Sequence, residues 1–88
     1  MSDPLFAGLA ARFRDRALAD GAQLRAALAE SDCAKVGAIA HALSGSAGTF
    51  GFAAISVHAE ALESAVDAGE DQLVEAAKPL LAALDALA

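Results

Sequence analysis

The segment that decides the fold reads His41-Ala42-Leu43-Ser44-Gly45-Ser46-Ala47-Gly48-Thr49-Phe50-Gly51. Its apolar residues fall at the spacing of one face of an α-helix, and the same stripe extends back along the chain. Ser31 and Asp32 are suitable caps for the beginning of this helix, and Gly51 suits the left-handed position that closes it. The segment therefore predicts an amphipathic helix with one buried face. The members of its stripe are Val36, Ile39, Ala40, Leu43, Ala47 and Phe50.

The preceding part of the chain predicts a first, longer helix. Asp3 is a good N-cap, and Pro4 suits the first helical position that follows it. The apolar stripe keeps its phase across Gly21, so we expect one helix that continues to about Glu30. The residues expected to face inward are Phe6, Leu9, Phe13, Ala17, Leu24 and Leu28.

Two more helices are expected after Gly51. The third runs from about Phe52 and ends at Gly69, and the fourth has Asp71 as its cap. Short connections make consecutive helices antiparallel neighbours. The sequence therefore predicts an all-α fold, an antiparallel up-down-up-down four-helix bundle, in a single domain of residues 1–88. The residues expected inward are Ile55, Ala59, Leu62 and Val66, then Leu73, Ala77, Leu80, Leu84 and Leu87.

Composition agrees with a helical fold and excludes several classes of function. Apolar residues make up 57% of the 88 residues, and Tyr and Trp are absent, which favours an Ala- and Leu-rich helical core over a sheet. The formal net charge is −6, with no cluster of Lys and Arg, so neither nucleic acid nor a membrane is an expected partner. A single cysteine, Cys33, cannot form an internal disulfide. We expect a cytoplasmic monomer that is complete from Met1.

His41 is the residue most suited to chemistry. At about 100° per residue it lies roughly 130–140° from the centre of the apolar stripe, so its side chain is expected to point outward. Each glycine inside a helix costs ~0.5–1 kcal/mol relative to alanine, and a bare face therefore indicates a need for access. An exposed neutral imidazole is a competent nucleophile near pH 7, and phosphoryl transfer to it needs mainly an open approach. The helical neighbours of His41 are all small: Ala34, Gly37, Ala38, Ser44, Gly45 and Gly48.

This pattern resembles the signature of histidine-containing phosphotransfer (HPt) domains, and the resemblance covers nearly the whole chain. It implies that His41 is the phosphorylated residue and that the partners are response-regulator receiver domains and a hybrid histidine kinase. The family's members are not kinases in themselves. No cofactor and no metal site are expected on this chain, since Mg²⁺ belongs to the partner receiver domain. The resemblance rests on His41-x-Leu43-x-Gly45-x-Ala47, with Gly51, Ile55, Leu62 and Glu63.

One position departs from the family pattern. The family usually has a lysine three residues after the histidine, where it helps to neutralise the phosphoryl group, and this chain has Ser44. A serine hydroxyl can donate a hydrogen bond but brings no charge. We expect Ser44, Gly45 and Gly48 to support the phosphate or to give access to it. Glu63 has two readings, a hydrogen bond near the histidine and an ordinary solvated carboxylate, and we favour the second. The first helix offers four cations of unknown position: Arg12, Arg14, Arg16 and Arg25.

Three functions remain open at this point. The first is a phosphorelay intermediate that accepts a phosphoryl group on His41 from the aspartate of a receiver domain and passes it to another response regulator. The second is an HPt-like module that docks receiver or kinase domains without carrying phosphate. The third is an independent hydrolase that uses His41 and Ser44.

Overall fold

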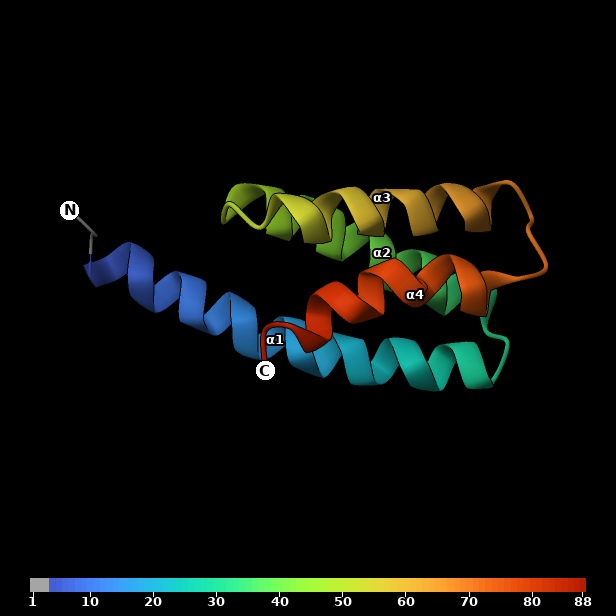
Figure 1. The fold of residues 1–88 in the computed structure, drawn as a ribbon, viewed down its shortest axis with the longest axis horizontal. Helices are drawn as coiled ribbons and strands as arrows, with labels where there is room; N and C mark the ends of the chain where they lie inside the picture. Colours follow the sequence, from blue (N-terminus) through green and yellow to red (C-terminus); the bar gives the residue numbers. More distant parts are fainter. Residues whose placement is uncertain (1–3) are drawn as a thin grey trace.

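The computed structural model describes residues 4–88, and that part of the chain consists of four helices without a strand. Each helix packs against the next, and the last packs against the first. Short connections reverse the chain direction, so neighbouring helices run antiparallel (Figure 1). The predicted all-α up-down-up-down four-helix bundle is confirmed. The helices are α1 (Pro4–Ala29), α2 (Cys33–Thr49), α3 (Ala53–Asp67) and α4 (Leu73–Asp85).

The first helix is much longer than the other three. Its 26 residues span about 39 Å at 1.5 Å per residue, against about 26 Å for α2. The first turns of α1 therefore project beyond the rest of the bundle (Figure 1). The helix continues through Gly21, as the unbroken stripe predicts. Asp3, the predicted N-cap, and the side chain of Phe6 lie outside the described residues.

A left-handed residue closes each of the first three helices. Gly51 has a φ of 82° and Gly69 a φ of 71°, which confirms both predicted helix ends. Ser31 takes the same role at the end of α1, with a φ of 55°. After each of them, an amide donates to the carbonyl five residues earlier, so the last turns end with paired carbonyls. These bonds join Asp32 to Ala27 at 2.9 Å, Phe52 to Ala47 at 2.8 Å and Glu70 to Ala65 at 3.1 Å.

Two of the predicted N-caps are wrong, and one is confirmed. The side chain of Asp32 accepts a hydrogen bond from the backbone N–H of Lys35 at 3.1 Å, and this caps α2. Ser31 does not share that role, because its left-handed backbone belongs to the end of α1. Asp71 does not cap α4, because the helix begins one residue later than Asp71 requires. Gln72 occupies the cap position and makes no side-chain cap hydrogen bond.

The core is apolar throughout the part of the chain that the structure describes. Most residues predicted to face inward are buried, while Leu28, Ile39, Phe50, Val66 and Leu87 are partly buried against the core. The prediction for Leu9 is wrong: it is 39% exposed, because its turn lies where α1 leaves the bundle. The largest fully buried side chains are Leu24, Leu43, Leu62, Leu80, Leu84 and Val36.

Three phenylalanines close one end of the bundle. The ring of Phe13 stacks on Phe50, with ring centroids 5.6 Å apart, and on Phe52 at 4.9 Å. Stacked aromatic pairs add to the stability that area burial provides. This cluster holds α1 against the turn that joins α2 to α3. None of the described helices combines the length and the apolar character needed to cross a membrane.

Candidate functional site

His41 lies on the solvent-facing side of α2. Its side chain is 76% exposed, whereas Ala40 and Leu43, on the opposite side of the helix, are at most 1% exposed. The outward direction predicted from helical periodicity is therefore correct. The buried face anchors α2 firmly against its neighbours, so the imidazole is presented from a rigid element.

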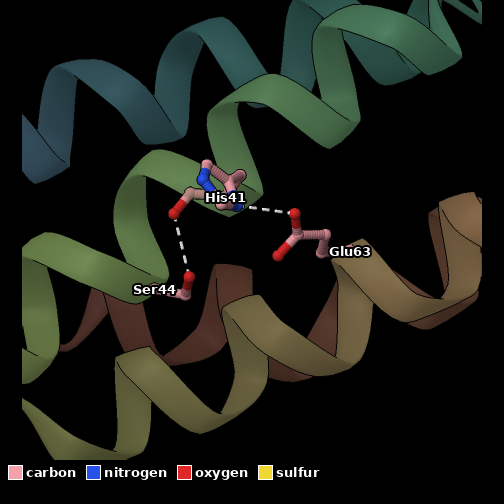
Figure 2. Close-up of polar contacts among 3 residues, drawn as sticks. All are labelled: His41, Ser44 and Glu63. Atoms are coloured by element: carbon pink, nitrogen blue, oxygen red, sulfur yellow. Dashed lines mark hydrogen bonds and ion pairs between the residues drawn. The ribbon is translucent and has the colours of Figure 1, made fainter.

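Glu63 of α3 holds one nitrogen of this imidazole. Nδ1 of His41 lies 2.7 Å from Oε2 of Glu63 (Figure 2), and the Glu63 side chain is only 29% exposed. An ionised carboxylate can only accept, so Nδ1 carries the hydrogen and donates it. The hydrogen bond of one ring nitrogen sets the state of the other. In the neutral imidazole with its hydrogen on Nδ1, Nε2 carries the lone pair, and Figure 2 shows this nitrogen turned away from Glu63.

The prediction of Glu63 as an ordinary solvated carboxylate is wrong. Glu63 follows the fully buried Leu62, so it lies at the rim of the contact between α3 and α2, where its carboxylate reaches the imidazole. The only signal in the sequence was its place in the family pattern beside Leu62. Helical periodicity could not reveal the contact, because it says nothing about the rotation of one helix relative to another.

The hydroxyl of Ser44 is directed at the backbone. Its Oγ donates to the carbonyl oxygen of His41 at 2.8 Å, within the same helix (Figure 2). The carbonyl of Ser44 in turn accepts a hydrogen bond from Oγ of Ser56 at 2.8 Å, which ties α2 to α3. A hydrolase that used a serine nucleophile would need a hydrogen bond between the hydroxyl and the imidazole. Ser44 instead makes its hydrogen bond to a carbonyl.

The glycines around His41 are of two kinds. A Cβ added at Gly45 would meet nothing within 4 Å, so this position is open to solvent. A Cβ at Gly48 would meet Oγ of Ser56 at 3.5 Å, an ordinary contact with α3. At Gly37 it would approach Cγ1 of Val66 to 3.2 Å, which is tight. Of the two glycines predicted to give access, only Gly45 borders open space on its own side, whereas Gly48 faces α3.

The cations of α1 occupy different places. Nη2 of Arg25 pairs with Oδ2 of Asp85 at 2.8 Å, at the end of α4. Arg12 and Arg16 instead line a groove between α1 and α2, together with α2 residues that include Ala42, the neighbour of His41. Within residues 4–88, no three side chains of His, Cys, Asp or Glu come together as a metal site would require.

The family model described as the Hpt domain matches residues 8–88, a span that includes His41, Ser44, Gly45 and Glu63. No curated protein and no solved structure matches the chain.

Proposed function

The chain belongs to the Hpt domain family, and on this premise we propose that it is a phosphorelay intermediate that cycles between His41 and phosphohistidine. Hpt domains are phosphocarrier modules that interact with receiver domains and kinases in two-component systems and have no catalytic activity of their own. In the proposed cycle, His41 takes the phosphoryl group from the aspartate of a receiver domain or hybrid kinase. It then passes the group to another response regulator. Such a carrier would work as a monomer in the cytoplasm.

The observation that carries this proposal is the pairing of an exposed imidazole with a carboxylate at one nitrogen only. The lone pair of Nε2 attacks the phosphorus of the partner's phosphoaspartate. The N–P bond forms as the P–O bond to the aspartate breaks, and the electron pair leaves with the partner's carboxylate. Mg²⁺ held by the partner would neutralise charge on the phosphoryl oxygens. No proton needs to leave His41, because its hydrogen stays on Nδ1.

Glu63 supports this step as a positioning residue. Its carboxylate holds the hydrogen on Nδ1 and offsets the positive charge that spreads over the ring when Nε2 binds phosphorus. Glu63→Ala should lower the transfer rate and remove the preference for the Nδ1–H tautomer, which ¹⁵N NMR of the ring reports. Glu63→Gln should retain the tautomer, since an amide oxygen also accepts, while the rate falls because the charge is lost. An unchanged tautomer in Glu63→Ala would contradict this role.

The alternative of a docking module without phosphate rests on the missing lysine. The bond from Ser44 to the carbonyl of His41 is consistent with a weaker local support for the phosphoryl group. The carrier function is favoured because the imidazole is 76% exposed and an added Cβ at Gly45 meets nothing within 4 Å, which supports an open approach to His41.

The deciding experiment is incubation with phosphorylated receiver domains. The wild-type chain should acquire an acid-labile, base-stable label, as expected for phosphohistidine. His41→Gln should acquire none while its stability changes by no more than about 0.5 kcal/mol, because the side chain is exposed. Binding of receiver domains without any label would favour the docking module, and labelling of His41→Gln would contradict the assignment of the acceptor.

A further inference from the structure

A groove runs between α1 and α2 beside the face that carries His41. It encloses about 490 Å³, and its surface combines apolar and charged side chains. Apolar contributions come from Leu9 and Phe13 of α1 and from Ile39 of α2, while Arg12 and Arg16 supply the positive charge. An apolar surface with charges at its edge is the usual composition of a protein-binding patch.

Arg12 and Arg16 place two positive charges in one groove of a chain whose formal net charge is −6. Among the other described cations, Arg25 pairs with Asp85 and Lys78 with Glu75, each at 2.8 Å. Arg14 and Lys35 form no ion pair within 4 Å with a described carboxylate, but neither lines the groove. None of the described carboxylates forms an ion pair with Arg12 or Arg16 within 4 Å.

Asp20 shares the groove with Arg16. Burial raises the pKa of the Asp20 carboxyl above its ordinary value, and the charge of Arg16 partly lowers that pKa again. In the groove, Arg16 has the negative charge of Asp20 nearby without a close ion pair, and Arg12 lies further toward the projecting end of α1. Positive charge thus predominates toward that end of the groove.

The groove and the phosphorylation face are contiguous. Ala38 and Ala42 line the groove, and in the sequence they lie three residues before His41 and one residue after it. Residues three apart on a helix are surface neighbours. A protein that docks its phosphoaspartate over Nε2 of His41 is therefore brought next to this groove.

From this arrangement we propose that Arg12 and Arg16 determine partner specificity, by recognising carboxylates on an acidic segment of the receiver domain whose apolar side chains fill the groove between α1 and α2. The inference rests on the proposed phosphocarrier function. Charge complementarity supports it: an acidic chain exposes two unpaired guanidinium groups where its partner must approach, and guanidinium groups bind carboxylates well.

The test measures transfer from a receiver domain that phosphorylates the wild-type chain. Arg12→Glu and Arg16→Glu should each raise the KM for the phosphorylated receiver about threefold to tenfold, with kcat nearly unchanged. The loss should shrink in high salt, since the lost interaction is electrostatic. Arg12→Lys and Arg16→Lys should retain most of the wild-type KM. The matched control is Arg14→Glu, which makes the same charge change on α1 at an exposed position that does not line the groove.

Each outcome decides the inference. An equal effect of Arg14→Glu, or no effect of the groove variants while the wild type transfers phosphate, overturns the role of the arginines and leaves the phosphocarrier function intact. A change of oligomeric mass in the groove variants with unchanged transfer would assign the groove to a second copy of this chain and would also overturn it. Failure of the wild type to take phosphate from any receiver domain overturns the proposed function, and the inference with it.

Discussion

Gly37 and Gly45 lie in the same helix, and the sequence places both among the small residues around His41. The structure nevertheless gives them opposite surroundings. Gly37 faces α3, where an added Cβ would come within 3.2 Å of Val66. Gly45 faces open space, with nothing within 4 Å of the same added atom. One glycine allows two helices to approach, and the other keeps a surface clear beside His41. The comparison shows that a run of small residues can serve two needs that differ only in direction.

The strongest test of this division is a substitution on the packed face. Leu43 is 1% exposed, and Leu43→Ala should lower the free energy of unfolding by about 2–5 kcal/mol, because it removes apolar contacts and leaves a cavity. Chemical denaturation measures the change. Ser46→Ala is the control on the exposed surface of the same helix and should change stability by no more than about 0.5 kcal/mol. Equal denaturation midpoints for the two variants would show that the buried face of α2 is assigned wrongly.

The open face is tested by its effect on transfer. Gly45→Glu should fold, since the position has room, but it should slow phosphoryl transfer at least about tenfold, or ~1.4 kcal/mol of barrier. The glutamate obstructs the approach to His41 and repels an anionic phosphoryl group. Ala26→Glu is the control, because Ala26 is an exposed helical position on α1 that does not line the groove. Transfer by Gly45→Glu at the wild-type rate would contradict the access role.

A smaller effect separates the two glycines directly. Gly45→Ala should stabilise the protein by ~0.5–1 kcal/mol, since alanine is the better helix former and the added methyl meets nothing. Gly37→Ala should lose most of this gain, because Val66 must shift to admit the methyl group. Thermal melts compare the two variants.

A double-mutant cycle identifies Val66 as the cause. When Gly37→Ala is made in a Val66→Ala background, the alanine should recover its stabilising effect, giving a measurable coupling between the two positions. If Gly37→Ala stabilises the otherwise wild-type protein as much as Gly45→Ala does, the close approach of Gly37 to Val66 has no effect on stability.

The smallest expected effect concerns Asp20 at the edge of the groove. Burial raises the pKa of its carboxyl in the folded protein, more than Arg16 lowers it. The folded state then binds the proton more tightly than the unfolded state, so stability falls as pH rises from below the ordinary carboxyl pKa through the folded value. The free energy of unfolding of the wild type, relative to that of Asp20→Asn, should be larger in acid than at neutral pH. Chemical denaturation of both proteins at both pH values measures this difference. If the relative stability of the wild type instead increases from acid to neutral pH, the charge of Arg16 lowers the pKa of Asp20 more than burial raises it.

Much of the site could be predicted from the sequence because it depends on one helix. The outward direction of His41 follows from its angular distance to Val36, Leu43 and Ala47, and Gly51 marks the turn by its tolerance of positive φ. Glu63 could not be assigned, because its contact with Nδ1 crosses between two helices. The prediction that Leu9 faces inward failed for a related reason. The apolar stripe of α1 continues through Leu9, but the other helices end before they can cover it.

The sequence by itself determined four amphipathic helices, their order and the exposure of His41, because helical periodicity relates every side chain to the axis of its own helix. Only the tertiary structure decided which carboxylate holds Nδ1, which glycine faces open space and which arginines share the groove beside His41. Those features depend on how far each helix is rotated and shifted relative to its neighbours. That arrangement is set by the packing of the whole core, including Phe13 against Phe50 and the close approach of Gly37 to Val66.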